Sequence, residues 1–129
     1  MKILLITDTH YGVKSDSNLI HDTYKDYWDN FIFPLCEKEK ITECIHLGDV
    51  FDRPKYTTGL TLKRIKEDFL DRFNDIGIKC TFLIGNHDCY YKNTLNPNYV
   101  DKIIHPMGFR VISEPTTIMY DNVKIDLIP

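Results

Sequence analysis

The sequence has little that would mark a secreted, membrane-spanning or nucleic-acid-coating protein. It has no excess of positive charge, since 16 Lys and Arg against 19 Asp and Glu give a net charge of −3. Such a chain has no overall positive field to hold a phosphate backbone, which excludes a nonspecific basic coat on DNA. Its first apolar run, Ile3 to Ile6, is too short for a signal sequence or a membrane span, so a cytoplasmic location is expected.

The four cysteines provide no framework for cross-linking. Cys36, Cys44, Cys80 and Cys89 form no Cys-x-x-Cys pair and lie in apolar stretches. This pattern is typical of buried thiols in a reducing compartment, and it argues against a cysteine-based zinc site. The sequence also has no internal repeat and no low-complexity segment. Its 129 residues, 43% of them hydrophobic, are enough for one domain with a single core.

Apolar periodicity predicts strands alternating with helices in the first two thirds of the chain. Three short apolar runs, each followed by a polar loop, are typical of buried strands. The two longer segments between them keep the helical period. Pro34 is expected to kink the first helix or to end it near Phe33. The strands are expected over residues 2–7, 44–47 and 80–84, and the helices over residues 18–38 and 58–76.

The pattern changes after residue 89. Residues 90–97 are expected to be irregular because turn-forming residues dominate there. Residues 100–104 favour a short helix and residues 109–112 a short strand. A tight hairpin is predicted at the end, with strands at 116–120 and 123–128 joined at Asp121-Asn122.

Each of the three predicted strands ends in a loop with several potential metal ligands. These loops begin about 40 residues apart, which is the length of one strand–helix–strand unit. Parallel strands would bring them to one edge of the sheet, where α/β proteins bind ligands. Their carboxylate, imidazole and carboxamide groups suit Mn, Fe, Co or Zn ions, so the sequence predicts a two-metal site. The loops read Asp8-Thr9-His10, Gly48-Asp49-Val50-Phe51-Asp52 and Gly85-Asn86-His87-Asp88.

In order and spacing these loops resemble those of the calcineurin-like metallophosphoesterases. The resemblance implies that Asp8 and His10 hold a first metal ion. It implies further that Asp49 bridges two ions and that Asn86 holds the second through its side-chain oxygen. The implied cofactor is therefore a pair of divalent ions, with Mn²⁺ preferred and Mg²⁺, Fe²⁺ or Zn²⁺ as alternatives. The implied reaction is phosphoester hydrolysis.

The same resemblance gives roles to three residues that are not metal ligands. His87 would donate a proton to the leaving oxygen, and Asp52 would fix the imidazole of His87 in one tautomer. Arg53 resembles the phosphate-contacting arginine of related phosphatases, although a surface ion pair explains it equally well.

Within this superfamily the chain is most similar to the SbcD-type nuclease subunits of DNA double-strand-break repair and to their phage counterparts. Residues 8–12 and 48–52, the aromatic helix between them and the hairpin from Thr116 to Pro129 carry the resemblance. It implies an α/β fold, the N-terminal half of a metallophosphoesterase sandwich, with a mixed but mostly parallel sheet flanked by helices and a C-terminal hairpin. It also implies DNA as substrate, a coiled-coil ATPase partner of the SbcC type, a homodimer as one assembly, and no membrane. A phage-encoded protein would act in the cytoplasm of a bacterial host.

The resemblance is incomplete at the C-terminal end. The family completes its metal pair with a further His and a Gly-His-x-His segment downstream, and the sequence reaches Pro129 with neither. We therefore expect residues 1–129 to form a nuclease domain that is incomplete at its C-terminal end, with weak metal binding and little hydrolysis by the chain alone. Two alternatives are a phosphatase or cyclic-nucleotide phosphodiesterase, favoured by Arg53 and the acidic charge, and a noncatalytic fragment that scaffolds the ATPase.

Other notable residues are interpreted as structural. Asp88 is expected to be a turn or helix-start carboxylate, His46 a packed strand residue and His21 a solvated helix residue. Trp28 is expected in the core or on a subunit face. For residues 90–92 a solvated loop is favoured over contact with substrate.

Overall fold

The computed structural model describes residues 1–129, and its centre is a four-stranded sheet in which all strands run parallel. The strand order is β1-β2-β3-β6, so every neighbour is reached by a crossover. This arrangement confirms the predicted α/β class, with the antiparallel pairs lying outside the central sheet. The strands are β1 (Ile3–Ile6), β2 (Glu43–His46), β3 (Lys79–Leu83) and β6 (Arg110–Ile112).

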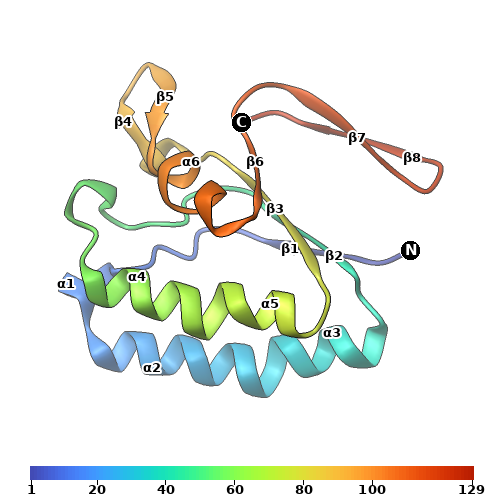
Figure 1. The fold of residues 1–129 in the computed structure, drawn as a ribbon, viewed down its shortest axis with the longest axis horizontal. Coiled ribbons are helices and arrows are strands. Elements are labelled where there is room, and N and C mark those ends of the chain that lie inside the picture. Colours follow the sequence, from blue (N-terminus) through green and yellow to red (C-terminus); the bar gives the residue numbers. More distant parts are fainter.

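Two long helical segments connect the first three strands and cover one face of the sheet (Figure 1). Each segment contains a π-helical turn in its middle, which shifts the helical register by one residue. The first segment consists of α2 (Asn18–Tyr27), η1 (Trp28–Ile32) and α3 (Phe33–Glu39). The second consists of α4 (Gly59–Ile65), η3 (Lys66–Leu70) and α5 (Asp71–Asp75).

Of the two outcomes expected at Pro34, a kink or an end near Phe33, the end is wrong, because the first helical segment continues to Glu39. Pro34 lies in the first turn of α3, directly after the π-helical turn η1. A proline is tolerated there because the first N–H groups of a helix have no intrahelical acceptor to lose. The wider turn thus accommodates the ring without ending the helix.

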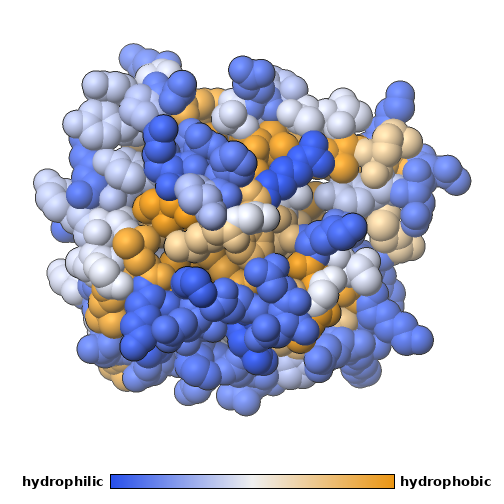
Figure 2. Space-filling view, in the orientation of Figure 1, coloured by the Kyte–Doolittle hydropathy of each residue, from blue (hydrophilic) through white to orange (hydrophobic).

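The opposite face of the sheet is partly covered by the C-terminal hairpin. Strands β7 (Thr116–Tyr120) and β8 (Val123–Leu127) pair antiparallel, as predicted. Their inward side chains form a small apolar cluster with the sheet, whereas a core of 20 buried residues lies between the sheet and the helices. The small cluster contains Ile45, Leu83, Ile112, Ile118, Tyr120 and Leu127. Figure 2 shows hydrophobic atoms in the band between the helices and the hairpins, and a hydrophilic outer helical face.

A second hairpin corrects the expectation that residues 90–97 are irregular. β4 (Cys89–Tyr91) pairs antiparallel with β5 (Thr94–Asn98), and the register shifts between Cys89 and Tyr91. The turn-rich composition concealed this pairing because Pro and Asn are poor strand formers. α6 (Tyr99–Ile103) and η5 (His105–Met107) then lead into β6.

None of the helices has the length and apolar character that crossing a bilayer would require. The four cysteines are all free, three of them buried and Cys89 half-buried.

Candidate metal centre

The three polar loops converge at the carboxyl ends of β1, β2 and β3. We call them the first loop (residues 8–10), the second loop (residues 48–52) and the third loop (residues 85–88). Parallel pairing continues beyond the strands, because Asp8 and His10 donate backbone hydrogen bonds to the carbonyls of Gly48 and Asp49, each at 3.1 Å. One ligand atom from each of Asp8, His10 and Asp49 lies within 4.8 Å of the others. The parallel topology therefore brings these side chains together, as the sequence predicted.

The first loop supplies a carboxylate and an imidazole. His10 Nε2 lies 3.3 Å from Asp8 Oδ1, and His10 Nδ1 is a buried ring nitrogen with no hydrogen-bond partner. The Thr7 hydroxyl donates to Asp8 Oδ2 and, together with the neighbouring His10, lowers the pKa of Asp8. A charged carboxylate beside a ring nitrogen is a donor set that fits a divalent cation.

The second loop places the Asp49 carboxylate directly against the third loop. Asp49 Oδ1 accepts a hydrogen bond from the His87 backbone N–H at 2.9 Å. A Cβ atom on Gly85 would lie 2.2 Å from the same oxygen, so only glycine leaves room for Asp49 at this position. Gly48, with φ +109°, lies against the backbone of Gly85 in the same way, since its Cβ would be 2.7 Å from Gly85 Cα. Two close glycine contacts therefore fix how Asp49 faces the third loop.

The third loop forms a short 3₁₀ turn, η4 (Asn86–Asp88), in which Asn86 and His87 are exposed. The His87 ring lies 5.2 Å from the His10 ring, edge to face, so the His87 imidazole borders the Asp8–His10–Asp49 group. Asp49 is held by the backbone N–H of His87 and not by the Asn86 side chain. His87 thus lies beside the group, and Asn86 precedes it in the same turn.

Asp52 lies beside His10, whereas the sequence analysis expected it beside His87. Its Oδ1 atom is 3.8 Å from His10 Nδ1, and its Oδ2 atom is 3.9 Å from Arg53 Nε. The backbone N–H of Asp52 donates to the carbonyl of Tyr11, which draws the end of the second loop toward the first. Arg53 itself is 76% exposed and points into solvent at the edge of the site.

His46 connects the first and second loops from their buried side, a role that the sequence did not indicate. It is fully buried, as expected, between Phe69 and Phe82. The backbone N–H of Gly48 donates to His46 Nδ1 at 3.2 Å, and His46 Nε2 lies 3.0 Å from the Thr9 hydroxyl. Burial lowers the pKa of His46 to about 3, so the ring is neutral. A histidine inside an apolar strand was the available signal, because a buried polar ring needs partners.

Asp88 connects the second and third loops in a similar way. Its carboxylate is fully buried and accepts backbone hydrogen bonds from Val50, Phe51 and Gly85 at 3.0–3.3 Å. Burial raises the pKa of Asp88 to about 6, although these hydrogen bonds oppose the shift. Asp88 is thus the turn carboxylate that was predicted, and it holds two loops at once.

All three members of the group have left-handed backbone conformations. The φ angles are 53° at Asp8, 44° at His10 and 54° at Asp49. Non-glycine residues seldom adopt such angles, and they persist where surrounding contacts over-determine the backbone. The contacts of His46, Asp88 and the paired glycines supply that constraint.

A second strained segment follows the first loop. In α1 (Val13–Asp16) the residues Lys14, Ser15 and Asp16 all have positive φ angles. The Asp16 carboxylate anchors the segment by accepting hydrogen bonds from the Thr58 and Thr61 hydroxyls and by pairing with His21. His21 is therefore buried, and the expectation of a solvated residue was wrong, because the adjacent turn folds over it.

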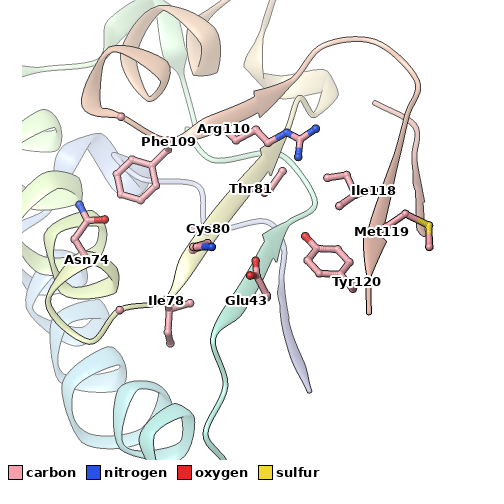
Figure 3. A pocket seen from close by; sticks show the side chains of 13 residues that line it. Glu43, Asn74, Ile78, Cys80, Thr81, Phe109, Arg110, Ile118, Met119 and Tyr120 are labelled. Atoms are coloured by element: carbon pink, nitrogen blue, oxygen red, sulfur yellow. The ribbon is translucent and has the colours of Figure 1, made fainter. Parts of the chain in front are cut away.

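The largest cavity, about 640 Å³, lies elsewhere (Figure 3). It is lined by Glu43, Lys79 and Arg110, the first residues of β2, β3 and β6, and by the β7 side chains of Ile118, Met119 and Tyr120. This cavity is thus at the amino ends of the strands, and none of the residues of the Asp8–His10–Asp49 group lines it.

Comparison with known proteins agrees with the loop geometry. Residues 1–124 match the family model described as calcineurin-like phosphoesterase. The chain is 37% identical over 131 residues to exonuclease subunit 1 of Enterobacteria phage T4. It is 34% identical over 90 residues to the DNA double-strand break repair protein Mre11 of Saccharolobus solfataricus.

These alignments cover a larger share of this chain than of the relatives' own sequences, so the chain spans well under half the length of either relative. They include 100% of this chain but 38% of the phage protein, and 68% of this chain but 23% of the archaeal protein. The fold also resembles the crystal structure of Pseudomonas putida nuclease MPE, with a TM-score of 0.61 and 22% sequence identity, over 92% of this chain and 50% of that one.

Proposed function

Since the chain belongs to the calcineurin-like phosphoesterase family, we propose that it is a divalent-metal-dependent nuclease that hydrolyses the phosphodiester bonds of DNA. The observation that carries the proposal is the meeting of Asp8, His10 and Asp49 within 4.8 Å at one edge of the sheet. Carboxylate and imidazole ligands on rigid strand ends are what two-ion phosphoesterase chemistry requires. The relatives described as an exonuclease subunit and as a break-repair protein support DNA as the substrate.

We assign the ligands as the resemblance implied. Asp8 and His10 would hold one ion, Asp49 would be shared by two, and Asn86 would hold the second through its side-chain oxygen. When bound, the ions supply Lewis-acid polarisation of the phosphoryl group and activation of the attacking water. Mn²⁺ is the proposed metal, because a mixed oxygen and nitrogen donor set without thiolates suits it. The Nε2 atom of His10, 3.3 Å from Asp8 Oδ1, supports the assignment of both residues to one ion.

The residues around this group have separate proposed tasks. His87, exposed at the rim with its ring facing His10, donates a proton to the leaving oxygen. Asp52, within 4 Å of His10 Nδ1, orients that imidazole rather than that of His87. Arg53, at the exposed edge, contacts the substrate phosphate.

A coiled-coil ATPase subunit of the SbcC type is the proposed partner, by resemblance to the repair nucleases. A homodimer and a cytoplasmic location are predictions of the same kind.

The proposal is tested by the release of nucleotides from linear duplex DNA by the complete gene product in the presence of Mn²⁺. Asp49→Asn removes the charge of the bridging ligand but keeps its shape, so we expect the rate to fall at least about 100-fold if one ion is lost. Asp121→Asn is the matched control, because Asp121 has nearly the same φ angle, 52°, and lies in the distant β7–β8 turn. Equal activity of the two variants would contradict the metal site.

The two alternative functions are distinguished from a DNA nuclease by assays with another substrate and with the ATPase partner. Turnover of a small chromogenic phosphodiester without any effect on DNA would favour the phosphatase or cyclic-nucleotide phosphodiesterase. Full binding of the ATPase with no Mn²⁺ uptake by calorimetry would favour a noncatalytic scaffold.

A further inference from the structure

A group of cations and tyrosines borders the metal centre on one side. Two segments form it, residues 53–58 directly after Asp52 and residues 89–99 directly after Asp88. We call these segments the basic–aromatic rim. They contact each other because Lys55 Nζ lies 4.4 Å from the centre of the Tyr90 ring. Segments that continue from the second and third loops meet here, so the rim adjoins the site.

All charged side chains of the rim are positive. The rim contains Arg53, Lys55 and Lys92 and no Asp or Glu, although the whole chain has a net charge of −3. A ligand that approaches the acidic metal loops over the rim therefore meets three cations and no carboxylate of the rim. A polyanion such as a nucleic acid backbone is the kind of ligand that this distribution attracts.

The rim also exposes aromatic rings that the core does not use. Tyr56 is 76% exposed, Tyr91 57% and Tyr90 43%. Tyr90 and Tyr91 are consecutive in β4, and consecutive strand side chains ordinarily point to opposite faces. Their rings nevertheless meet at 4.7 Å, edge to face, where the β4–β5 register shifts. Such irregularities commonly redirect side chains near functional sites.

Lys55 and Tyr91 offer contacts to different parts of a nucleotide, the phosphate and the base. Lys55 lies over the Tyr90 ring, so its ammonium group is held at the surface rather than extended into solvent. The Tyr91 ring beside it is mostly uncovered. A base stacked on Tyr91 would leave its phosphate within reach of the rim cations.

We propose that the basic–aromatic rim binds a single-stranded segment of nucleic acid, with a base stacked on Tyr91 and the backbone neutralised by Lys55, Lys92 and Arg53. The proposal concerns the substrate of the proposed nuclease and rests on that function for its biological meaning. Single strands are favoured over duplex because an exposed ring can stack only on a base whose face is free. The rim would then guide an unpaired strand toward the metal loops.

The direct test is fluorescence anisotropy of a labelled 15-nucleotide oligothymidylate, measured in EDTA so that neither metal binding nor cleavage contributes. Tyr91→Ala is expected to weaken binding by about 5-fold or more, which corresponds to the loss of one stacked base. Tyr91→Phe keeps the ring and is expected to bind like the unchanged chain. Phe31→Ala is the matched control, because Phe31 is also 57% exposed but lies on the helical layer.

Salt dependence tests the cations separately from the rings. Replacing one phosphate contact on a single strand reduces the slope of log K against log salt by about 0.7. Lys92→Ala is therefore expected to reduce the slope by that amount, and Tyr91→Ala to lower affinity without changing the slope. Unchanged affinity in Tyr91→Ala, or a loss that Phe31→Ala reproduces, would overturn the proposal. Equal weakening for an oligothymidylate and a blunt duplex would overturn the preference for single strands.

The test also distinguishes failure of the rim from failure of the metal site. In the complete gene product, Tyr91→Ala should leave metal-dependent cleavage of bis(p-nitrophenyl) phosphate unchanged, because so small a diester needs no stacking platform. Asp49→Asn should abolish that cleavage but retain oligothymidylate binding in EDTA. Loss of cleavage in Tyr91→Ala would show that the substitution damages the metal site, and would count against a separate binding rim.

Discussion

The Nε2 atom of His46 lies 3.0 Å from the hydroxyl oxygen of Thr9, and this contact joins the two loops that carry Asp8, His10 and Asp49. Gly48 donates its backbone N–H to His46 Nδ1, so the ring proton is on Nε2 and is donated to Thr9. The Thr9 hydroxyl in turn donates to the carbonyl oxygen of Val50 at 3.2 Å. A single buried ring thus sets the spacing between the first and second loops.

Replacing His46 with Phe should weaken metal binding more than it weakens the fold. Phe can occupy the space between Phe69 and Phe82, but it leaves the Gly48 N–H and the Thr9 hydroxyl without their partner. Loss of an outer contact of this kind lowers metal affinity by roughly 10- to 100-fold. Isothermal titration with Mn²⁺, alongside the melting temperature, measures the two effects separately.

The control for His46→Phe is Phe73→Leu, a change in the same core at a residue that packs on Phe33 and Phe69. This variant should melt at a lower temperature and bind Mn²⁺ with unchanged affinity. If both variants lost affinity only in proportion to their loss of stability, His46 would be a packing residue without a positioning role.

His46 should also make the stability of the chain depend on pH. Burial lowers its folded-state pKa to about 3, whereas in the unfolded chain the pKa is near the ordinary histidine value of 6.5. The unfolded state therefore binds the extra proton first, so stability is full above pH 6.5 and is lost as the pH falls toward 3. Between pH 7 and pH 5 this group should cost about 2 kcal/mol of unfolding free energy. Urea denaturation of the unchanged chain and of His46→Phe at both pH values isolates this share, and parallel losses in the two proteins would contradict it.

The convergence of the loops could be predicted from sequence because it follows from topology. Three apolar runs separated by helical crossovers must form parallel strands, and parallel strands end at the same edge of a sheet. The distance between Asp8 and Asp49 along the chain is then irrelevant to their distance in space. What the sequence could not show is the partner of Asp52, because a loop residue can turn toward either of two nearby imidazoles.

The strained backbone of residues 14–16 and the pairing of β4 with β5 could not be predicted from the sequence either. Nothing in the identity of Lys14 and Ser15 indicates a left-handed turn, since these residue types ordinarily avoid positive φ. The burial of His21 follows from that turn and was missed for the same reason. The β4–β5 hairpin was missed because its residues have low strand propensity and tertiary contacts override it.

The strained turn predicts that a glycine at position 15 stabilises the protein. Ser15 has φ 55° and ψ 43°, a left-handed conformation that costs a residue with a Cβ atom energy and that glycine adopts freely. Ser15→Gly should raise the unfolding free energy by about 0.5–1 kcal/mol in urea denaturation. Ser17→Gly is the matched control, because Ser17 has φ −63° and should lose stability through the added freedom of the unfolded chain. The reverse order of the two variants would mean that the turn is relaxed in solution.

Gly85 should tolerate no side chain, because its missing Cβ leaves the space that Asp49 occupies. A Cβ there would lie 2.2 Å from Asp49 Oδ1 and 2.3 Å from Asp49 N, so Gly85→Ala must displace the second loop. We expect a loss of about 1–3 kcal/mol of stability from overpacking. Since the displaced oxygen belongs to the proposed bridging ligand, Mn²⁺ affinity should fall as well.

Gly59→Ala provides the control: nothing lies within 4 Å of its added Cβ, and alanine favours the first turn of α4. That variant should be as stable as the unchanged chain or more so, with the same Mn²⁺ affinity. Equal metal binding by both variants would show that contact with Gly85 does not control the position of Asp49.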